Sequence, residues 1–269
     1  MKVVSTLTLL FLIYSFLPAQ VVNTEKLRLS NTGKSLVGEI DVNFGLSRNK
    51  AGQTVRFGGL GRLELLKAKS KWMLLSGFGL TQFRNVDEPG SAPKNFSNNG
   101  FAHLRYNFEV NDWITWEAFT QAQYDEIQEV DLRTLTGTGP RFKLIQNDSS
   151  HLFWGALYMY EYENNSVETT GPNGEFTQLI GYERNHRLST YLSGGINVTR
   201  YFSINHVTYF QPRLDQWSDF RISSETTLTV KLTNRISLKS YFQFIFDDRP
   251  PATVPRTMYN FTNGLSASF

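Results

Sequence analysis

The chain ends with Met258-Tyr259-Asn260-Phe261-Thr262-Asn263-Gly264-Leu265-Ser266-Ala267-Ser268-Phe269, in which large apolar and small polar residues alternate. Successive side chains of a β-strand point to opposite faces, so Tyr259, Phe261 and Leu265 share an apolar face. An apolar final residue, Phe269, is unusual in a soluble domain, whose ends normally fray into water. Taken alone, this pattern is equally compatible with the closing strand of a soluble β-domain and with a strand of a membrane barrel.

Residues 1–20 have the layout of a secretory signal peptide. Lys2 supplies a positive start, residues 3–17 are almost wholly apolar, and Pro18-Ala19-Gln20 gives a small-residue exit, so we expect cleavage near Ala19 or Gln20. An apolar run of about 15 residues is short against the roughly 20 that a spanning helix needs, which disfavours a membrane anchor. The polar residues 21–35 are expected to form a short periplasmic lead-in to a single domain over residues 36–269.

Residues 220–232 show the alternation most clearly. The apolar set is Phe220, Ile222, Leu228, Val230 and Leu232, and the charged set of the opposite parity is Arg221, Glu225 and Lys231. Reversing this register would place the charges against lipid, at up to roughly 2–4 kcal/mol for each basic residue near the middle of a membrane. The charged set therefore identifies the face that points away from lipid.

Twelve such segments follow one another from Leu36 to the end of the chain, three of them (71–83, 130–145 and 201–212) with less regular alternation. The expected connections are 47–54, 67–70, 84–98, 111–112, 126–129, 146–150, 164–185, 199–200, 213–218, 233–234 and 249–255. Every second connection is short, and all the long ones fall between them. Short periplasmic turns, longer external loops and periplasmic termini are typical of outer-membrane barrels. The sequence therefore predicts an all-β fold, a single up-and-down antiparallel transmembrane barrel of about 12 strands.

Composition excludes several classes of protein. Cysteine is absent, so disulfides, zinc-thiolate sites and cysteine nucleophiles are excluded. The net charge of +3, without a cluster of Lys or Arg, gives no indication of nucleic-acid binding. The four histidines have no metal-ligand spacing, so no metal site is expected. His186 and Ser189 lie three residues apart on one predicted strand, on opposite faces, and cannot form a catalytic pair.

Several stretches resemble a known family. They are 131–139 (DLRTLTGTG), 158–163 (YMYEYE), 185–191 (NHRLSTY), 208–213 (TYFQPR), 219–224 (DFRISS) and 247–251 (DDRPP). In order and spacing they resemble the bacterial salt-induced outer-membrane proteins, catalogued as a domain of unknown function (family 481), over most of residues 36–269. The resemblance implies an outer-membrane β-barrel and transfers no catalytic residues. The strand that ends in Phe269 likewise resembles the assembly signal of such barrels, which implies the barrel-assembly machinery as a partner.

The predicted registers turn acidic and basic residues in nearly equal number into the barrel. The expected lumen charge network is Glu39, Asp41, Arg62, Glu64, Arg105, Glu117, Arg141, Glu161, Glu163, Arg187, Arg221, Glu225, Lys239 and Asp247. Eight strands are just filled by side chains, whereas sixteen or more leave an aqueous channel. A twelve-stranded barrel lies between these cases. Two interpretations therefore stay open: a salt-bridged plug that stiffens the barrel, and a narrow pore of mixed charge with little ion selectivity.

Two further features suggest binding at the barrel ends. Glu161 and Glu163, with Arg141 and Lys143 as neighbours, are a candidate cluster at the external end, and loops 84–98 and 164–185 are long enough to hold a ligand. A carboxylate pair can exchange protons, but solvated or ion-paired glutamates explain the pattern more simply. Aromatic residues near strand ends predict girdles at the two membrane interfaces, with sugar stacking as the alternative. These residues are Trp72, Trp113, Trp116, Trp154, Trp217, Tyr106, Tyr124, Tyr162 and Tyr259.

The sequence thus predicts a structural or narrow-pore, passive-transport role in the bacterial outer membrane, and the family name suggests a link to envelope or salt stress. We expect membrane lipid as a partner, no cofactor, no enzyme activity and no catalytic residues. Two alternatives remain: a barrel-embedded enzyme that acts at the external rim, and a soluble exported barrel that binds a ligand.

Overall fold

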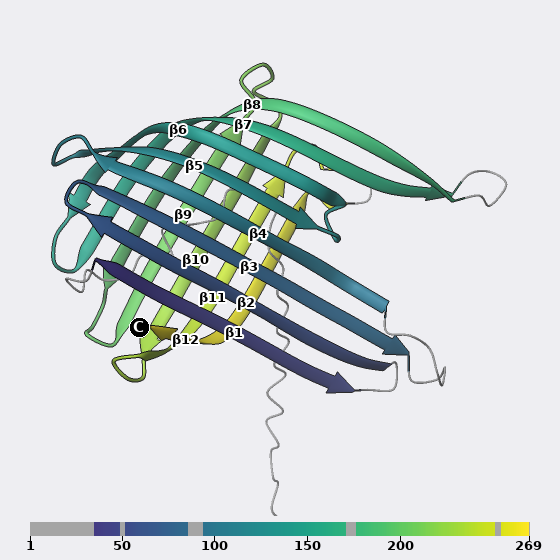
Figure 1. The fold of residues 1–269 in the computed structure, drawn as a ribbon, viewed down its shortest axis with the longest axis horizontal. Coiled ribbons are helices and arrows are strands. Elements are labelled where there is room, and N and C mark those ends of the chain that lie inside the picture. The colour runs from purple at the N-terminus through teal and green to yellow at the C-terminus, as the bar shows by residue number, and fades with distance from the viewer. Residues whose placement is uncertain (1–34, 49–51, 86–93, 171–175, 251–253, 269) are drawn as a thin grey trace, which may run out of the picture.

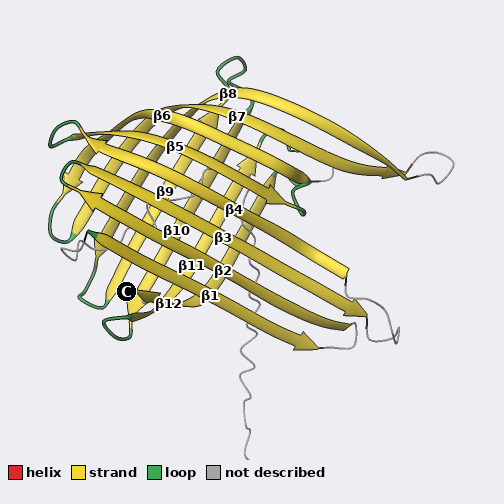
Figure 2. Ribbon diagram, viewed as in Figure 1, coloured by secondary structure: helices red, strands yellow, loops and turns green. Residues whose placement is uncertain are grey.

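The computed structural model describes residues 35–48, 52–85, 94–170, 176–250 and 254–268. They form a closed antiparallel barrel of twelve strands, in which each strand pairs with its neighbours in sequence and the first pairs with the last (Figures 1 and 2). The strands are β1 (Leu36–Arg48), β2 (Gly52–Lys67), β3 (Ser70–Asn85), β4 (Lys94–Glu109), β5 (Ile114–Asp125), β6 (Val130–Gln146), β7 (Ser150–Thr170), β8 (Phe176–Asn197), β9 (Phe202–Pro212), β10 (Phe220–Lys231), β11 (Ile236–Asp247) and β12 (Thr257–Ser268). The predicted fold class is confirmed. The expected signal peptide, most of the lead-in and Phe269 lie outside the described residues.

Among the described residues, no helix is long and apolar enough to cross a membrane.

The ends of several strands differ from the prediction. The expected loop 164–185 is wrong, because β7 and β8 pair continuously from Ser150 opposite Ile196 to Thr170 opposite Phe176. Their hairpin projects beyond the rest of the barrel (Figure 1). A hairpin that stands clear of the barrel wall can be polar on both faces, so it loses the alternation by which a strand is recognised. Likewise β4 begins at Lys94, inside the expected loop 84–98.

The outside of the barrel is apolar. Large exposed side chains occur on strands all around it, and a contiguous apolar surface of this kind marks contact with lipid or protein rather than water. The exposed aromatic residues include seven of the predicted girdle, namely Trp72, Trp113, Trp116, Trp154, Trp217, Tyr124 and Tyr259. Several of these rings pack against neighbours close to the short turns. The Trp72 and Tyr106 ring centroids lie 4.6 Å apart, and those of Phe142 and Trp154 lie 5.2 Å apart.

The three segments with irregular alternation do form strands. Their alternation is weak because their inward faces are themselves partly apolar. Met73 and Leu75 on β3, Leu135 on β6, and Val207 and Tyr209 on β9 are all buried inside the barrel. An apolar residue on each face removes the alternation between apolar and polar positions. The hydrophobic period is therefore weak in these strands, although the backbone pairing is regular over most of their length.

Candidate functional site: the charged interior of the barrel

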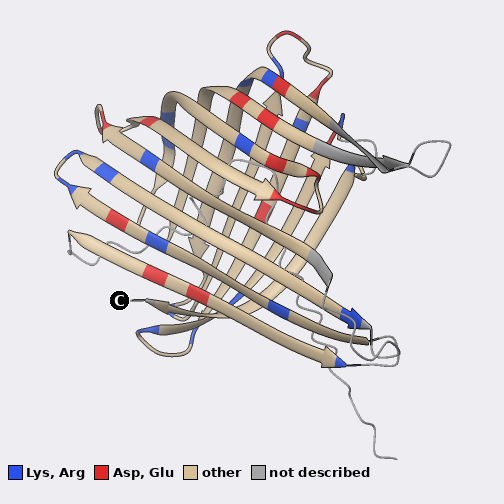
Figure 3. Ribbon diagram, turned by 45° about the vertical axis from the view of Figure 1, so that its right-hand side comes forward, with Lys and Arg blue, Asp and Glu red and all other residues tan. Residues whose placement is uncertain are grey.

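The structure places the residues of the expected lumen charge network on the inward faces of their strands. Asp41 and Asp247 are half-buried, and all the others are buried. Figure 3 shows acidic and basic positions side by side on neighbouring strands. A buried charge is tolerated only when it is paired and hydrogen-bonded, so the pairing of these groups decides what the interior can do.

The largest group surrounds Glu161 on β7, which we call the Glu161 cluster. Arg187 Nε on β8 donates to Glu161 Oε2 at 2.6 Å, and Arg221 Nη1 on β10 donates to Glu161 Oε1 at 2.5 Å. Arg133 on β6 also pairs with Glu161, and its Nε lies 3.2 Å from Glu163 Oε2. One buried carboxylate therefore holds three guanidinium groups from three strands.

Two aspartates extend this cluster toward the end of the barrel where β10 begins and β11 ends. Arg187 Nη1 lies 3.3 Å from Asp219 Oδ1, and Arg221 Nε donates to Asp247 Oδ2 at 2.5 Å. Arg213 adds a second guanidinium to Asp219, at 3.2 Å. The four arginines thus meet Glu161, Glu163 and the two aspartates, and Arg213 also pairs with the exposed Asp215 at 2.7 Å. An ion-paired network of this kind stabilises a fixed geometry and leaves little unpaired charge for a passing ion.

A second group surrounds Glu117 on β5, which we call the Glu117 cluster. Arg105 Nη1 on β4 lies 3.2 Å from Glu117 Oε2, and Arg141 Nη1 on β6 lies 3.5 Å from Glu117 Oε1. The Tyr191 hydroxyl on β8 donates to Glu117 Oε2 at 2.6 Å. Because β5 and β8 are not neighbours, this last bond crosses part of the lumen rather than following the wall.

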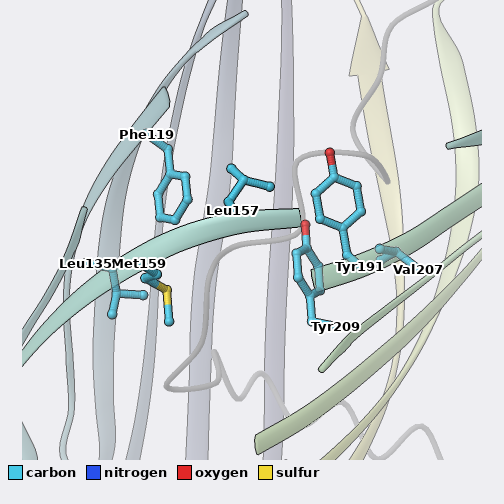
Figure 4. Packing of buried hydrophobic residues seen from close by; sticks show 7 residues of the cluster. All are labelled: Phe119, Leu135, Leu157, Met159, Tyr191, Val207 and Tyr209. Carbon is cyan, nitrogen blue, oxygen red and sulfur yellow. The ribbon is translucent and has the colours of Figure 1, made fainter. Parts of the chain in front are cut away.

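An apolar layer separates the two clusters. It consists of Phe119, Leu135, Leu157, Met159, Tyr191, Val207 and Tyr209, which come from β5 to β9 and point into the barrel (Figure 4). On β7, Leu157 and Met159 lie between Gly155, which is opposite Arg141, and Glu161. This side of the interior is therefore filled in three layers: charged, apolar and charged.

A third group lies where the barrel closes. Lys239 on β11 pairs with Glu39 on β1, and Ser266 on β12 donates to the same carboxylate. The Tyr241 hydroxyl on β11 donates to Asp41 Oδ2 at 3.0 Å. These bonds connect β11 to β1 across β12. They therefore reinforce the closure between the first and last strands.

The family model described as "Protein of unknown function, DUF481" matches residues 42–269. The chain belongs to this family. A search of the curated proteins found no match.

Solved structures similar to this DUF481 barrel include the translocator domain of an autotransporter and two porins. The translocator domain of the autotransporter NalP from Neisseria meningitidis matches with a TM-score of 0.51 and 8% identity, covering 87% of each chain. The NanC porin matches with a TM-score of 0.45 and 8% identity, over 86% of this chain and 98% of that one. The KdgM porin in complex with oligogalacturonate matches with a TM-score of 0.41 and 10% identity, over 87% of this chain and 99% of that one. At these identities the likeness to NalP establishes the fold, a barrel of outer-membrane type.

The candidate cluster of Glu161 and Glu163 with Arg141 and Lys143 is wrong in its basic members. In the register of β6 and β7, Arg141 lies opposite Gly155, far along the strand from Glu161, and its guanidinium reaches Glu117 instead. Lys143 is exposed. The arginines that do hold Glu161 include Arg133, which lies in one of the irregular segments. Arg133 has the same strand parity as Arg141 and is buried, so both point into the barrel.

Sequence reasoning also missed Tyr191 and Asp219. Tyr191 has the same parity as Arg187 and Ser189, so its inward direction follows from the strand, but parity does not reveal that its hydroxyl bonds to Glu117. Asp219 directly precedes β10, between the expected connection 213–218 and the expected strand 220–232, so strand parity alone does not single it out. His186 is exposed and Ser189 is buried, so the two lie on opposite faces, as expected. Among the described residues, no group of His, Asp and Glu could hold a metal ion.

The remaining wall of the DUF481 barrel, from β10 through β12 to β1, differs from the filled one. Its inward residues on β12, Asn260, Thr262 and Gly264, are small and half-buried, whereas Leu157 and Met159 on β7 are almost fully buried. A Cβ added at Gly264 would meet no atom within 4 Å. A Cβ added at Gly155, on the filled wall, would lie 2.2 Å from the Tyr191 ring. Open space in the interior therefore lies beside β12.

Proposed function

We propose that this barrel is a narrow, passive pore for small polar solutes, with its permeation path along the inward face of β12. The space next to Gly264 carries this proposal, because it is lined by small polar side chains while the opposite wall is filled. A path lined by Asn260, Thr262 and Gly264 offers hydrogen bonds, and the charges nearest to it, Lys239 and Glu39, are paired with each other. We therefore expect weak selectivity between cations and anions.

The ion-paired clusters have a structural role in this proposal. The Glu161 and Glu117 clusters reduce the cross-section and hold the wall rigid, so the pore stays narrow without a separate plug domain. The chain performs no catalytic step in this proposal. Membrane lipid surrounds the barrel, and the strand that ends in Phe269 is proposed to be recognised by the barrel-assembly machinery. The family resemblance supports a role in envelope or salt stress.

Planar-bilayer conductance tests the pore directly. The wild-type protein should give small, stable conductance steps at high salt. Gly264→Trp should lower the step size several-fold, because the indole would occupy the open space. Ala267→Trp, on the exposed outward face of the same strand, is the matched control and should leave conductance unchanged. Equal conductance in both variants would contradict the proposed path.

A non-conducting, structural barrel is the second candidate. It is favoured by the bonds that cross the lumen, from Tyr191 to Glu117 and from Arg221 to Glu161, each of which joins strands that are not neighbours. Complete absence of conductance for the wild-type protein, together with conductance in a Glu117→Gln variant that loosens the filled wall, would favour this role over the pore.

A further inference from the structure

The closure between β1 and β12 is much shorter than the strands that form it. The register consists of four pairs: Glu39–Ser268, Ile40–Ala267, Asp41–Ser266 and Val42–Leu265. In contrast, β1 pairs with β2 along its whole length, from Leu36 to Arg48. Toward the end of the barrel away from the termini, Phe44 to Arg48 of β1 and Thr257 to Phe261 of β12 are described by the structure but do not pair with each other. Figure 1 shows the two strands meeting near the C-terminus and running apart from there.

A spanning barrel normally keeps its first and last strands paired across the whole hydrocarbon layer, without such a gap. Four residue pairs cover about 13 Å at roughly 3.3 Å per residue, less than half of a hydrocarbon layer about 30 Å thick. Backbone groups that face lipid without hydrogen bonds cost several kcal/mol each, which is why spanning barrels are closed. An edge left open in the membrane therefore has to meet polar groups, whether from water in the lumen, from the protein's own side chains or from another molecule.

The two sides of the gap differ in polarity. Outside, Phe44, Leu46 and Phe261 are exposed apolar side chains, and Tyr259 is 78% exposed. Inside, the gap leads to the small polar face of β12 described above. A molecule lying across this edge would thus meet an apolar surface and a polar space within one strand width. That combination fits an amphiphile, with its chain outside and its head group inside.

Basic residues gather at this end on β1 to β3. Arg48 ends β1, Arg56 points inward from β2 opposite Gly45, and Arg84 lies near the end of β3, where Figure 3 shows basic positions. No carboxylate occurs among the described residues of β1 to β3 on this side, from 44 to 58 and from 79 to 85. Arg256 precedes β12, although Asp248 lies 4.0 Å from it and offsets part of its charge. The head group that this charge complements is anionic.

We propose that the gap between β1 and β12 is a lateral opening that admits an anionic amphiphile from the membrane, such as a fatty acid. Its acyl chain lies against Phe44 and Phe261, and its carboxylate lies in the lumen near Arg56. The carboxylate and its water supply the hydrogen bonds that the open strand edges require. This activity is independent of whether the lumen conducts small solutes along its length.

The geometry is tested by cysteine pairs, since the chain contains no cysteine. Continuing the observed register would set Gly45 opposite Thr262, so Gly45→Cys with Thr262→Cys probes the gap. Ile40→Cys with Ala267→Cys, which lie opposite each other in the observed register, is the positive control. The control should oxidise to a disulfide in membranes, whereas the gap pair should stay reduced, because Cα atoms more than about 7 Å apart cannot be bridged. Equal oxidation of both pairs would show a closed wall and overturn the proposal.

The occupant is tested by photolabelling in phosphatidylcholine vesicles with a palmitic acid analogue that carries a diazirine in its chain. Adducts should concentrate on residues 44–48 and 257–261. They should fall roughly tenfold in Arg56→Gln, since a charge-assisted hydrogen bond is lost. Arg235→Gln, which removes an exposed arginine at the other end of the barrel, is the matched control and should change nothing. The uncharged fatty alcohol analogue should label weakly.

Two outcomes would overturn this assignment. Adducts spread evenly around the barrel would mean ordinary boundary lipid, and equal labelling of the wild type and Arg56→Gln would remove the role of the head group. Disulfide-linked dimers of the single variant Leu46→Cys would show instead that a second copy of the chain covers the edge by strand pairing.

Discussion

The phenol of Tyr191 on β8 donates a 2.6 Å hydrogen bond to the carboxylate of Glu117 on β5, with β6 and β7 lying between the two strands. The same carboxylate holds Arg105 and Arg141. Glu117 thus joins groups from four strands at one level of the barrel. Its removal would leave two buried guanidinium groups without their acid.

Glu117→Gln is therefore expected to destabilise the barrel by about 3–5 kcal/mol, the usual effect of breaking a buried ion pair from one side. Tyr191→Phe removes one hydrogen bond to a carboxylate and leaves both ion pairs, so about 1.5–3 kcal/mol is expected. Urea unfolding in lipid vesicles, followed by tryptophan fluorescence, measures both. Glu109→Gln, at an exposed position on β4, is the control and should stay within about 0.5 kcal/mol of the wild type. Similar values for Glu117→Gln and Glu109→Gln would contradict the role of the cluster.

The contacts of the Glu161 cluster predict that the two glutamates on β7, Glu161 and Glu163, contribute unequally to the free energy of unfolding. Glu161 pairs with Arg133, Arg187 and Arg221, whereas Glu163 contacts Arg133 at 3.2 Å and Arg221 at 3.5 Å. Glu161→Gln should therefore lower the free energy of unfolding more than Glu163→Gln. A double-mutant cycle with Arg187→Gln isolates one of the pairs, and a coupling energy of about 0.5–3 kcal/mol is expected. Additive effects of the two single changes would exclude a direct interaction in the folded state.

The strand number and the inward charges could be predicted from the sequence, because both depend on alternation along single strands. Arg221 is an example, since it lies between Phe220 and Ile222, which are apolar and belong to the opposite face. Alternation does not predict which of these inward charges form ion pairs with each other. The partners of Glu161 depend on the relative stagger of four strands, and this stagger is set by pairing along the whole barrel.

The inward apolar layer could not be predicted either. Leu157 and Met159 share the parity of Glu161 and Glu163 on β7, and the parity rule alone offers no reason for apolar side chains there. These inward apolar side chains are explained by the packing between strands. Between two charged clusters, side chains from β5 to β9 are close enough to exclude water, so apolar contacts are favourable inside the barrel as they are in any core. The projecting hairpin of β7 and β8 could not be predicted either, because residues 164–185 do not alternate between apolar and polar positions.

An ion pair in the loop between β9 and β10 leads us to expect a shifted pKa at Asp215, outside the strands. Hydrogen bonds from the Arg213 guanidinium, at 3.0 and 2.7 Å, lower the pKa of the Asp215 carboxyl. A carboxyl whose pKa is depressed by folding contributes its stabilisation above its ordinary pKa and loses it as the pH falls through the folded value. A carbon-13 NMR titration should therefore give Asp215 a higher pKa in Arg213→Gln than in the wild type. An unchanged pKa would mean that the pair does not form in solution.

Two glycines on opposite walls provide a test of where the interior is full. A Cβ at Gly155 would lie 2.2 Å from the Tyr191 ring, while a Cβ at Gly264 would meet nothing within 4 Å. Gly155→Ala should therefore destabilise the barrel by about 1–3 kcal/mol through overpacking. Gly264→Ala should be neutral or slightly stabilising, because alanine restricts the unfolded chain. Combining Gly155→Ala with Tyr191→Leu, which removes the ring, should recover part of the loss, measured by the same urea unfolding. If both alanine variants were equally destabilised, the filled and open walls would not differ, and the proposed path beside β12 would lose its structural basis.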